Sequence, residues 1–74
     1  MSKDVFEIVA RVMNVPLDSV SEDSSMDTLV KWDSLHHMNL ILAVEEKMGI
    51  QFTDEDIISI NNVSNLIERI KLRG

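Results

Sequence analysis

Asp33, Ser34 and Leu35 are the residues of this chain whose types and spacing best suit chemistry. Asp33 precedes a run of apolar residues at helical spacing and is a favourable N-cap, because its carboxylate can accept a backbone N–H that the first turn leaves unpaired. Ser34 is thereby placed at the start of the helix, where partial positive charge and free N–H groups favour a phosphate. A hydroxyl at this position is a candidate site for a phosphodiester.

A helix over residues 34–48 is predicted to position Ser34. Apolar residues recur through it at helical spacing, and Gly49 follows as a residue that can end a helix. The apolar positions are Leu35, Met38, Ile41, Leu42, Val44 and Met48.

Two histidines follow on this helix and suggest two further kinds of chemistry. His37 could approach Ser34 and activate it as a nucleophile, but no nucleophile-elbow glycines flank Ser34 and a chain of 74 residues is too short for a deep cleft. Adjacent helical residues point about 100° apart, and neither histidine has a third ligand one turn on, so no zinc site is expected. Both His36 and His37 are predicted to be exposed polar residues, available to a phosphate or to another protein.

Three more helices are expected around this one. The first carries an apolar stripe over residues 5–13 and ends by Val15, because Pro16 disfavours helix in the residue before it. A short third helix follows Thr53 as N-cap, with three acidic residues in its first turn. Asn62 caps the last helix, whose apolar stripe comprises Val63, Leu66, Ile67 and Ile70.

Residues 14–32 form a long connection, interpreted as a loop with a turn near 25–29 that is fixed by scattered apolar side chains. Strand signals are poor, since the chain has no tyrosine and only three aromatic residues. Residues 1–74 are therefore expected to form one all-α domain. Its architecture would be a small four-helix bundle with a long first loop and a short third helix.

The charge distribution limits the classes of partner. Net charge is −6, and ten of the thirteen acidic residues lie between positions 18 and 56. This acidic middle argues against nucleic-acid binding and favours proteins with basic patches. The acidic clusters lack the pattern of an EF-hand calcium loop. With no signal peptide, membrane-spanning run or lipidation motif, a cytoplasmic protein without membrane insertion is expected.

Asp33-Ser34-Leu35, the apolar helix with Glu45 and Glu46 near its end, and Gly49-Ile50 together resemble the acyl carrier proteins. Length, segment spacing and acidity fit the same family. The resemblance implies that Ser34 carries 4′-phosphopantetheine, attached from coenzyme A by a phosphopantetheinyl transferase. The thiol of this arm would hold an acyl group as a thioester for fatty-acid, lipid or polyketide-type synthesis. Such a protein is a carrier and not an enzyme.

The resemblance also assigns roles to residues around Ser34. Asp33 and Leu35 flank the attachment point, and the apolar interior between the second, third and fourth helices could hold an acyl chain. Partner contacts are expected from acyl-loading and acyl-transferring enzymes acting on a monomeric carrier. The candidate partner contacts are Trp32, which could instead pack on the helix ends, and His36, His37, Glu45 and Glu46. The candidate acyl-pocket residues are Leu40, Leu42, Val44, Ile57 and Ile60.

Three positions depart from the pattern of fatty-acid carriers: His36, Asn39 and Lys47 stand where many of those carriers have an acidic residue. Together with Trp32 they make the chain more similar to stand-alone carriers of specialised bacterial pathways. Two alternatives stay open. One is an aminoacyl or peptidyl carrier, and the other is a helical interaction module without a prosthetic group.

Overall fold

Four α-helices and one short 3₁₀ helix form the regular structure of residues 2–74, the part of the chain that the computed structural model describes. No strand occurs among these residues, so the predicted all-α class is confirmed. The elements are α1 (Ser2–Met13), the 3₁₀ helix η1 (Leu17–Ser19), α2 (Ser34–Met48), α3 (Asp54–Ser59) and α4 (Val63–Arg73).

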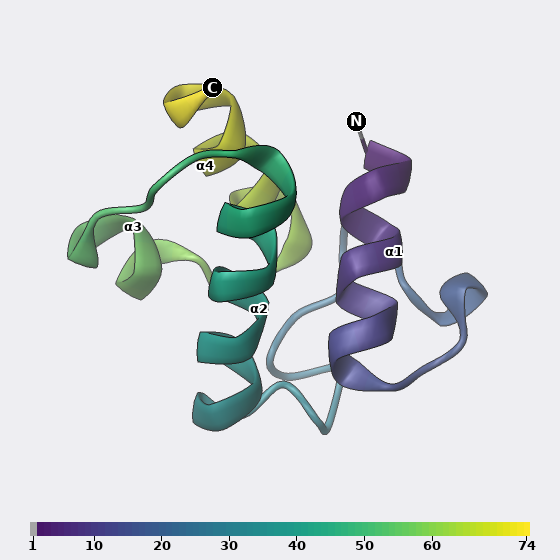
Figure 1. The fold of residues 1–74 in the computed structure, drawn as a ribbon. Coiled ribbons are helices and arrows are strands. Elements are labelled where there is room, and N and C mark those ends of the chain that lie inside the picture. The colour runs from purple at the N-terminus through teal and green to yellow at the C-terminus, as the bar shows by residue number, and fades with distance from the viewer. Residues whose placement is uncertain (1) are drawn as a thin grey trace.

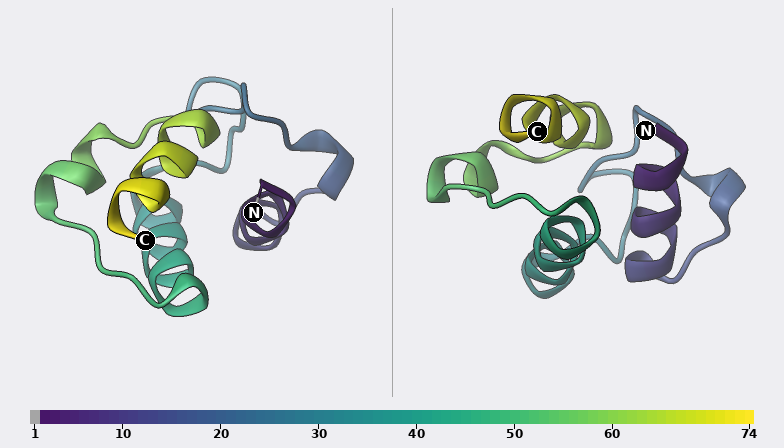
Figure 2. Two further views of the ribbon diagram at one scale, coloured as in Figure 1. Left: turned by 90° about the horizontal axis from the view of Figure 1, so that it is seen from above. Right: turned by 45° about the horizontal axis from the view of Figure 1, so that its top comes forward.

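The helices are arranged around α2. Figure 1 shows α1 and α2 side by side and running in opposite directions, with the start of α2 at the end of the molecule where α1 finishes. In both views of Figure 2, α3 lies on the side of α2 away from α1. Helix α4 lies behind α2 in the view of Figure 1. The long first loop therefore leaves the end of α1 and returns to the same end of the molecule, where α2 starts.

The core is built from one stripe of each long helix. The predicted stripe of α4 is buried throughout, from Val63 to Ile70. The predicted apolar run of α2 is only partly buried, because it contains two neighbouring stripes and α1 and α4 cover one of them. Leu40, Ile41 and Val44 are buried, whereas Leu35, Met38 and Leu42 are exposed.

Local side-chain hydrogen bonds explain where α2, α3 and α4 begin. The side chains of Asp33, Thr53 and Asn62 accept a backbone N–H in the first turns of α2, α3 and α4. These three predicted caps are confirmed. Gly49 ends α2 with φ +67°, a left-handed conformation that glycine adopts without a steric penalty.

The end of α1 uses a different residue for the same purpose. Asn14 has φ +57°, and asparagine tolerates this left-handed conformation better than most residues. The N–H of Val15 then donates to the carbonyl of Ala10 at 3.0 Å. Pro16 follows, so the helix ends within the limit that the proline predicts.

The long loop is more ordered than the sequence predicts. The 3₁₀ helix η1 was not anticipated, while the predicted turn is present, with the N–H of Leu29 donating to the carbonyl of Ser25 at 2.9 Å. Backbone hydrogen bonds also attach residues 22–26 to residues 61–64 at the start of α4. These bonds fix the path of the loop on its way to α2.

Candidate functional site

Ser34 is exposed as the first residue of α2, and Asp33 beside it organises the first turn. One carboxylate oxygen of Asp33 accepts the N–H of His36 at 2.9 Å and lies 2.8 Å from Nδ1 of the His36 ring. These two hydrogen bonds, the backbone one first, lower the pKa of Asp33 below its ordinary value. Ser34 therefore lies between an ionised carboxylate and the positive end of the helix.

His37 occupies a different environment from the one predicted. Only 9% of its surface is exposed, so the expectation that both histidines are exposed is wrong for this residue. Its Nδ1 accepts the indole N–H of Trp32 at 3.0 Å, and its Nε2 lies 2.9 Å from the carbonyl oxygen of Ile57. The reason is the turn of the helix, which directs position 37 toward α3 while position 36 stays at the surface.

Trp32 is buried, with 2% of its surface exposed. The structure thus shows the alternative in which the indole packs among the helix ends. A direct contact of this ring with a partner is not available in this arrangement. Trp32 instead anchors the segment that leads into Ser34.

The two acidic residues late in α2 differ in their surroundings. Glu46 is exposed, whereas Glu45 is half-buried and its carboxylate accepts the N–H of Phe52 at 2.8 Å. Glu45 therefore holds the segment between α2 and α3 close to α2. Glu46 is the more accessible of the two for an outside cation.

The residues assigned to an acyl interior do not all face inward. Leu40, Val44 and Ile60 are buried and Ile57 is half-buried, as an interior position requires. Leu42 is 59% exposed, so its assignment to the interior is wrong. Two residues along a helix turn the side chain by about 200°, which places Leu42 on the opposite face from Leu40 and Val44.

Asp56 is an important residue that the sequence did not single out. It is fully buried, and its carboxylate accepts hydrogen bonds from Arg69 at 2.9 Å and from Arg73 at 2.7 and 3.0 Å. The Arg73 bonds first, and then the backbone N–H of Thr53, hold the pKa of Asp56 far below its usual range. The signal in the sequence was the acidic first turn of α3 and the basic last turn of α4. Neither turn identified which acidic residue is paired.

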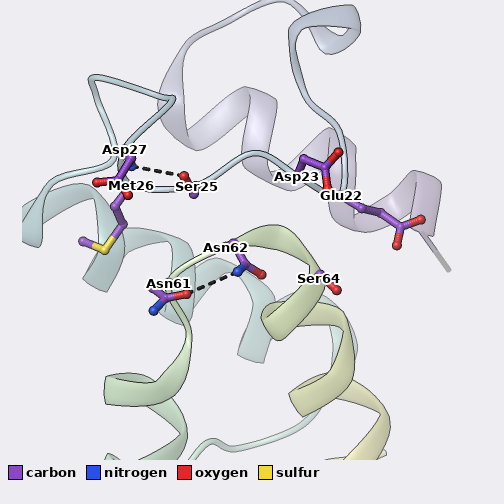
Figure 3. A pocket seen from close by; sticks show the side chains of 8 residues that line it. All are labelled: Glu22, Asp23, Ser25, Met26, Asp27, Asn61, Asn62 and Ser64. Carbon is purple, nitrogen blue, oxygen red and sulfur yellow. Dashed lines mark hydrogen bonds between the residues drawn. The ribbon is translucent and has the colours of Figure 1, made fainter.

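A surface hollow of about 500 Å³ lies away from Ser34. Figure 3 shows its walls, formed by the long loop on one side and the start of α4 on the other. Its lining residues are Glu22, Asp23, Ser25, Met26, Asp27, Asn61, Asn62 and Ser64. Across residues 2–74, no group of three or more histidine, cysteine or acidic residues is placed to hold a metal ion.

Known proteins match this chain over most of its length. A family model described as "Phosphopantetheine attachment site" matches residues 3–70. The chain is 37% identical to an acyl carrier protein of a Sulfurovum species, over 92% of this chain and 91% of that protein. It is 36% identical to the acyl carrier protein of Chloroherpeton thalassium, over 89% of this chain and 82% of that protein.

A solved structure has the same fold. The solution structure of a holo acyl carrier protein from Geobacter metallireducens superposes with a TM-score of 0.86. The match covers 97% of this chain and 83% of that one, at 25% sequence identity.

Fold, helix-start serine and sequence matches define a carrier domain that holds its cargo on a prosthetic group. Within that class, the chain belongs to the acyl carrier proteins of the phosphopantetheine-attachment family. It is a carrier and not an enzyme, its covalent cofactor is 4′-phosphopantetheine, and it interacts with enzymes, a phosphopantetheinyl transferase among them. No helix within residues 2–74 combines the length and the apolar character needed to cross a membrane.

Proposed function

We propose that Ser34 is the residue to which 4′-phosphopantetheine is attached. The observation that carries this proposal is the exposed hydroxyl of Ser34 at the first position of α2, directly after an N-capping aspartate. The first N–H groups of a helix lack partners within it and favour an anion, so a phosphate on Ser34 would be stabilised there. The exposed side chain of Ser34 is accessible to the group.

Each residue around Ser34 has a separate task in this proposal. The Oγ of Ser34 forms the bond to phosphorus, and Asp33 fixes the first turn while presenting negative charge to the transferase and its metal. The arm, when bound, supplies a thiol that holds the acyl group as a thioester. The protein presents this group and does not itself transform it.

We further propose that an acyl chain is sheltered against the interior faces of α2 and α3. Leu40, Val44 and Ile60 are buried and Ile57 is half-buried, which supports an apolar lining. Leu42 is excluded from this lining because its side chain is exposed. Ile57 stands where many fatty-acid carriers have alanine, so the space for a chain is small.

The partners are proposed to be acyl-loading and acyl-transferring enzymes with basic surface patches, which meet a monomeric, single-domain carrier in the cytoplasm. Asp33 and Glu46 are exposed and supply the negative charge. Between them the surface of α2 carries Met38 and Asn39 in place of a continuous acidic run. This mixed surface supports a role in a specialised pathway. The binding of its partner enzymes would depend less on charge than it would with a continuous acidic surface.

The attachment site is tested by replacing Ser34 with alanine. Ser34→Ala is expected to keep the helical circular dichroism spectrum and to abolish the mass increase produced by a promiscuous transferase and coenzyme A. Ser64→Ala is the matched control, since Ser64 is also an exposed serine in the first turn of a helix. It should be modified like the wild type.

Full modification of Ser34→Ala would refute the assignment of this serine. A wild-type protein that gains no mass under the same conditions would instead support a helical interaction module without a prosthetic group.

A further inference from the structure

A buried chain of hydrogen bonds joins the segment before Ser34 to α3. It runs from the indole N–H of Trp32 through the His37 ring to the carbonyl of Ile57, with distances of 3.0 and 2.9 Å. The Trp32 and His37 ring planes lie within 24° of each other, with centroids 6.2 Å apart. The two rings are therefore close to parallel, and the indole N–H of Trp32 is within hydrogen-bond distance of Nδ1 of His37.

The partners determine the protonation of the His37 ring. An indole N–H can only donate, so Nδ1 of His37 must accept and carries no proton. A carbonyl oxygen can only accept, so Nε2 must carry the proton and donate to Ile57. The neutral tautomer with hydrogen on Nε2 is the one form of His37 that satisfies both bonds.

The acceptor of this bond belongs to a helix that needs outside support. Helix α3 has six residues, and a helix this short is not stable alone. The carbonyl of Ile57 lies in the last turn, where carbonyls have no partner further along the helix. His37 supplies the missing donor at this end, while Arg69 and Arg73 of α4 hold Asp56 nearer the start.

We propose that His37 is a positioning residue that fixes α3 relative to Ser34. Its ring lies one turn beyond Ser34 on α2, and it connects Trp32, two residues before Ser34, to the end of α3. The start of α2 and helix α3 are thus held in a fixed relative position before an enzyme approaches Ser34. This role rests on the proposed attachment at Ser34.

The tautomer is measured on the unmodified protein by ¹⁵N NMR of the histidine ring at neutral pH. The Nε2–H form is expected for His37, together with a slowly exchanging indole N–H of Trp32, the only tryptophan. A ring of His37 protonated on Nδ1, whether neutral or charged, would overturn the proposal.

Two amide substitutions at His37 each remove one of its two hydrogen bonds and can keep the other. In His37→Asn the side-chain oxygen can replace Nδ1 as acceptor for Trp32, but the amide is too short to reach Ile57. In His37→Gln the amide nitrogen can replace Nε2 as donor to Ile57, and the acceptor for Trp32 is lost. The Asn variant should shift the amide signals of α3 and keep the protected indole, and the Gln variant should do the reverse.

The functional readout is the rate at which a promiscuous transferase loads each variant from coenzyme A. Both variants are expected to lower kcat/KM about 3- to 10-fold, the size expected for one lost hydrogen bond. The loss should appear mainly as a higher KM, because it disturbs a surface that is arranged before binding. Val9→Ala, a buried change in α1, controls for lost stability and should load at the wild-type rate below its melting temperature.

Loading of both His37 variants at the rate of Val9→Ala would show that His37 is merely structural and would overturn the positioning role. Modification of Ser34→Ala would refute the attachment site instead. The two failures are distinguishable, since the tautomer and the α3 signals are measured without the prosthetic group.

Discussion

At the level of single residues, Asp56 and Asp33 show how surroundings decide what a carboxylate does. Asp56 is fully buried and is held by two arginines of α4, whereas Asp33 is exposed and holds the start of α2. Both carboxyl groups have a lowered pKa, Asp56 chiefly through Arg73 and Asp33 chiefly through the N–H of His36. The first carboxylate stabilises the fold, and the second lies beside Ser34, the proposed attachment site.

Asp56 is expected to make stability depend on acid pH. The pKa of Asp56 is lower in the folded chain than in the unfolded chain, where an aspartate titrates at about 3.9. The stability it contributes is therefore complete well above pH 4 and is lost as the pH falls below about 4 toward the folded value. Thermal unfolding of the wild type and Asp56→Asn between pH 2 and pH 7 should show a large difference at neutral pH that shrinks in acid.

Asp54→Asn is the control for this prediction, since Asp54 lies exposed in the same helical turn. It should lower the melting temperature far less than Asp56→Asn at pH 7. A constant difference between Asp56→Asn and the wild type at every pH would contradict the role assigned to the buried carboxylate.

At the level of elements, helices α2, α3 and α4 each begin where a side chain accepts a backbone N–H, and α3 and α4 are also held in place by bonds from other segments. Helix α3 shows this most clearly, with a capping box between Thr53 and Asp56 at its start and His37 at its end. The start of α4 combines its cap with backbone bonds to the long loop. A helix boundary is therefore set locally, and its place in the molecule is set by distant partners.

Asn62→Ala should destabilise the protein by about 1 kcal/mol, because it removes the cap that accepts the N–H of Asn65 at 2.7 Å. Urea unfolding followed by circular dichroism measures the change. Asn61→Ala, one residue earlier and exposed, should change stability by less than about 0.5 kcal/mol. Equal losses in the two variants would show that the cap does not contribute.

At the level of the whole molecule, one small core depends on a single face of α2. Leu40 is fully buried on this face, and Leu42, two residues later, is 59% exposed. Surface left exposed on the opposite face does not contribute to the core. The same amino acid therefore has a different energetic role at these two positions.

Leu40→Ala is expected to cost about 2–5 kcal/mol, which combines the lost burial with the cavity left behind. Leu42→Ala should change stability by no more than about 0.5 kcal/mol. Chemical denaturation of both variants tests the pair. A similar cost at both positions would mean that Leu42 also packs inside the folded molecule.

The sequence by itself determined the helical class, the order of the helices and their caps. Asp33, Thr53, Asn62 and Gly49 were identifiable because capping depends on residues within one turn and on local backbone conformation. The position of Ser34 at a helix start followed from the same local rules. Its assignment as the attachment point stays a prediction until the serine is replaced.

Only the tertiary structure decided which of two apolar stripes on α2 is buried, because both have helical spacing and the neighbouring helices select one. The same holds for the polar pairs. His37 bonds a carbonyl 20 positions away, and Asp56 bonds arginines 13 and 17 positions away. Such partners are brought together by packing over the whole chain, so no local pattern of residues could identify them.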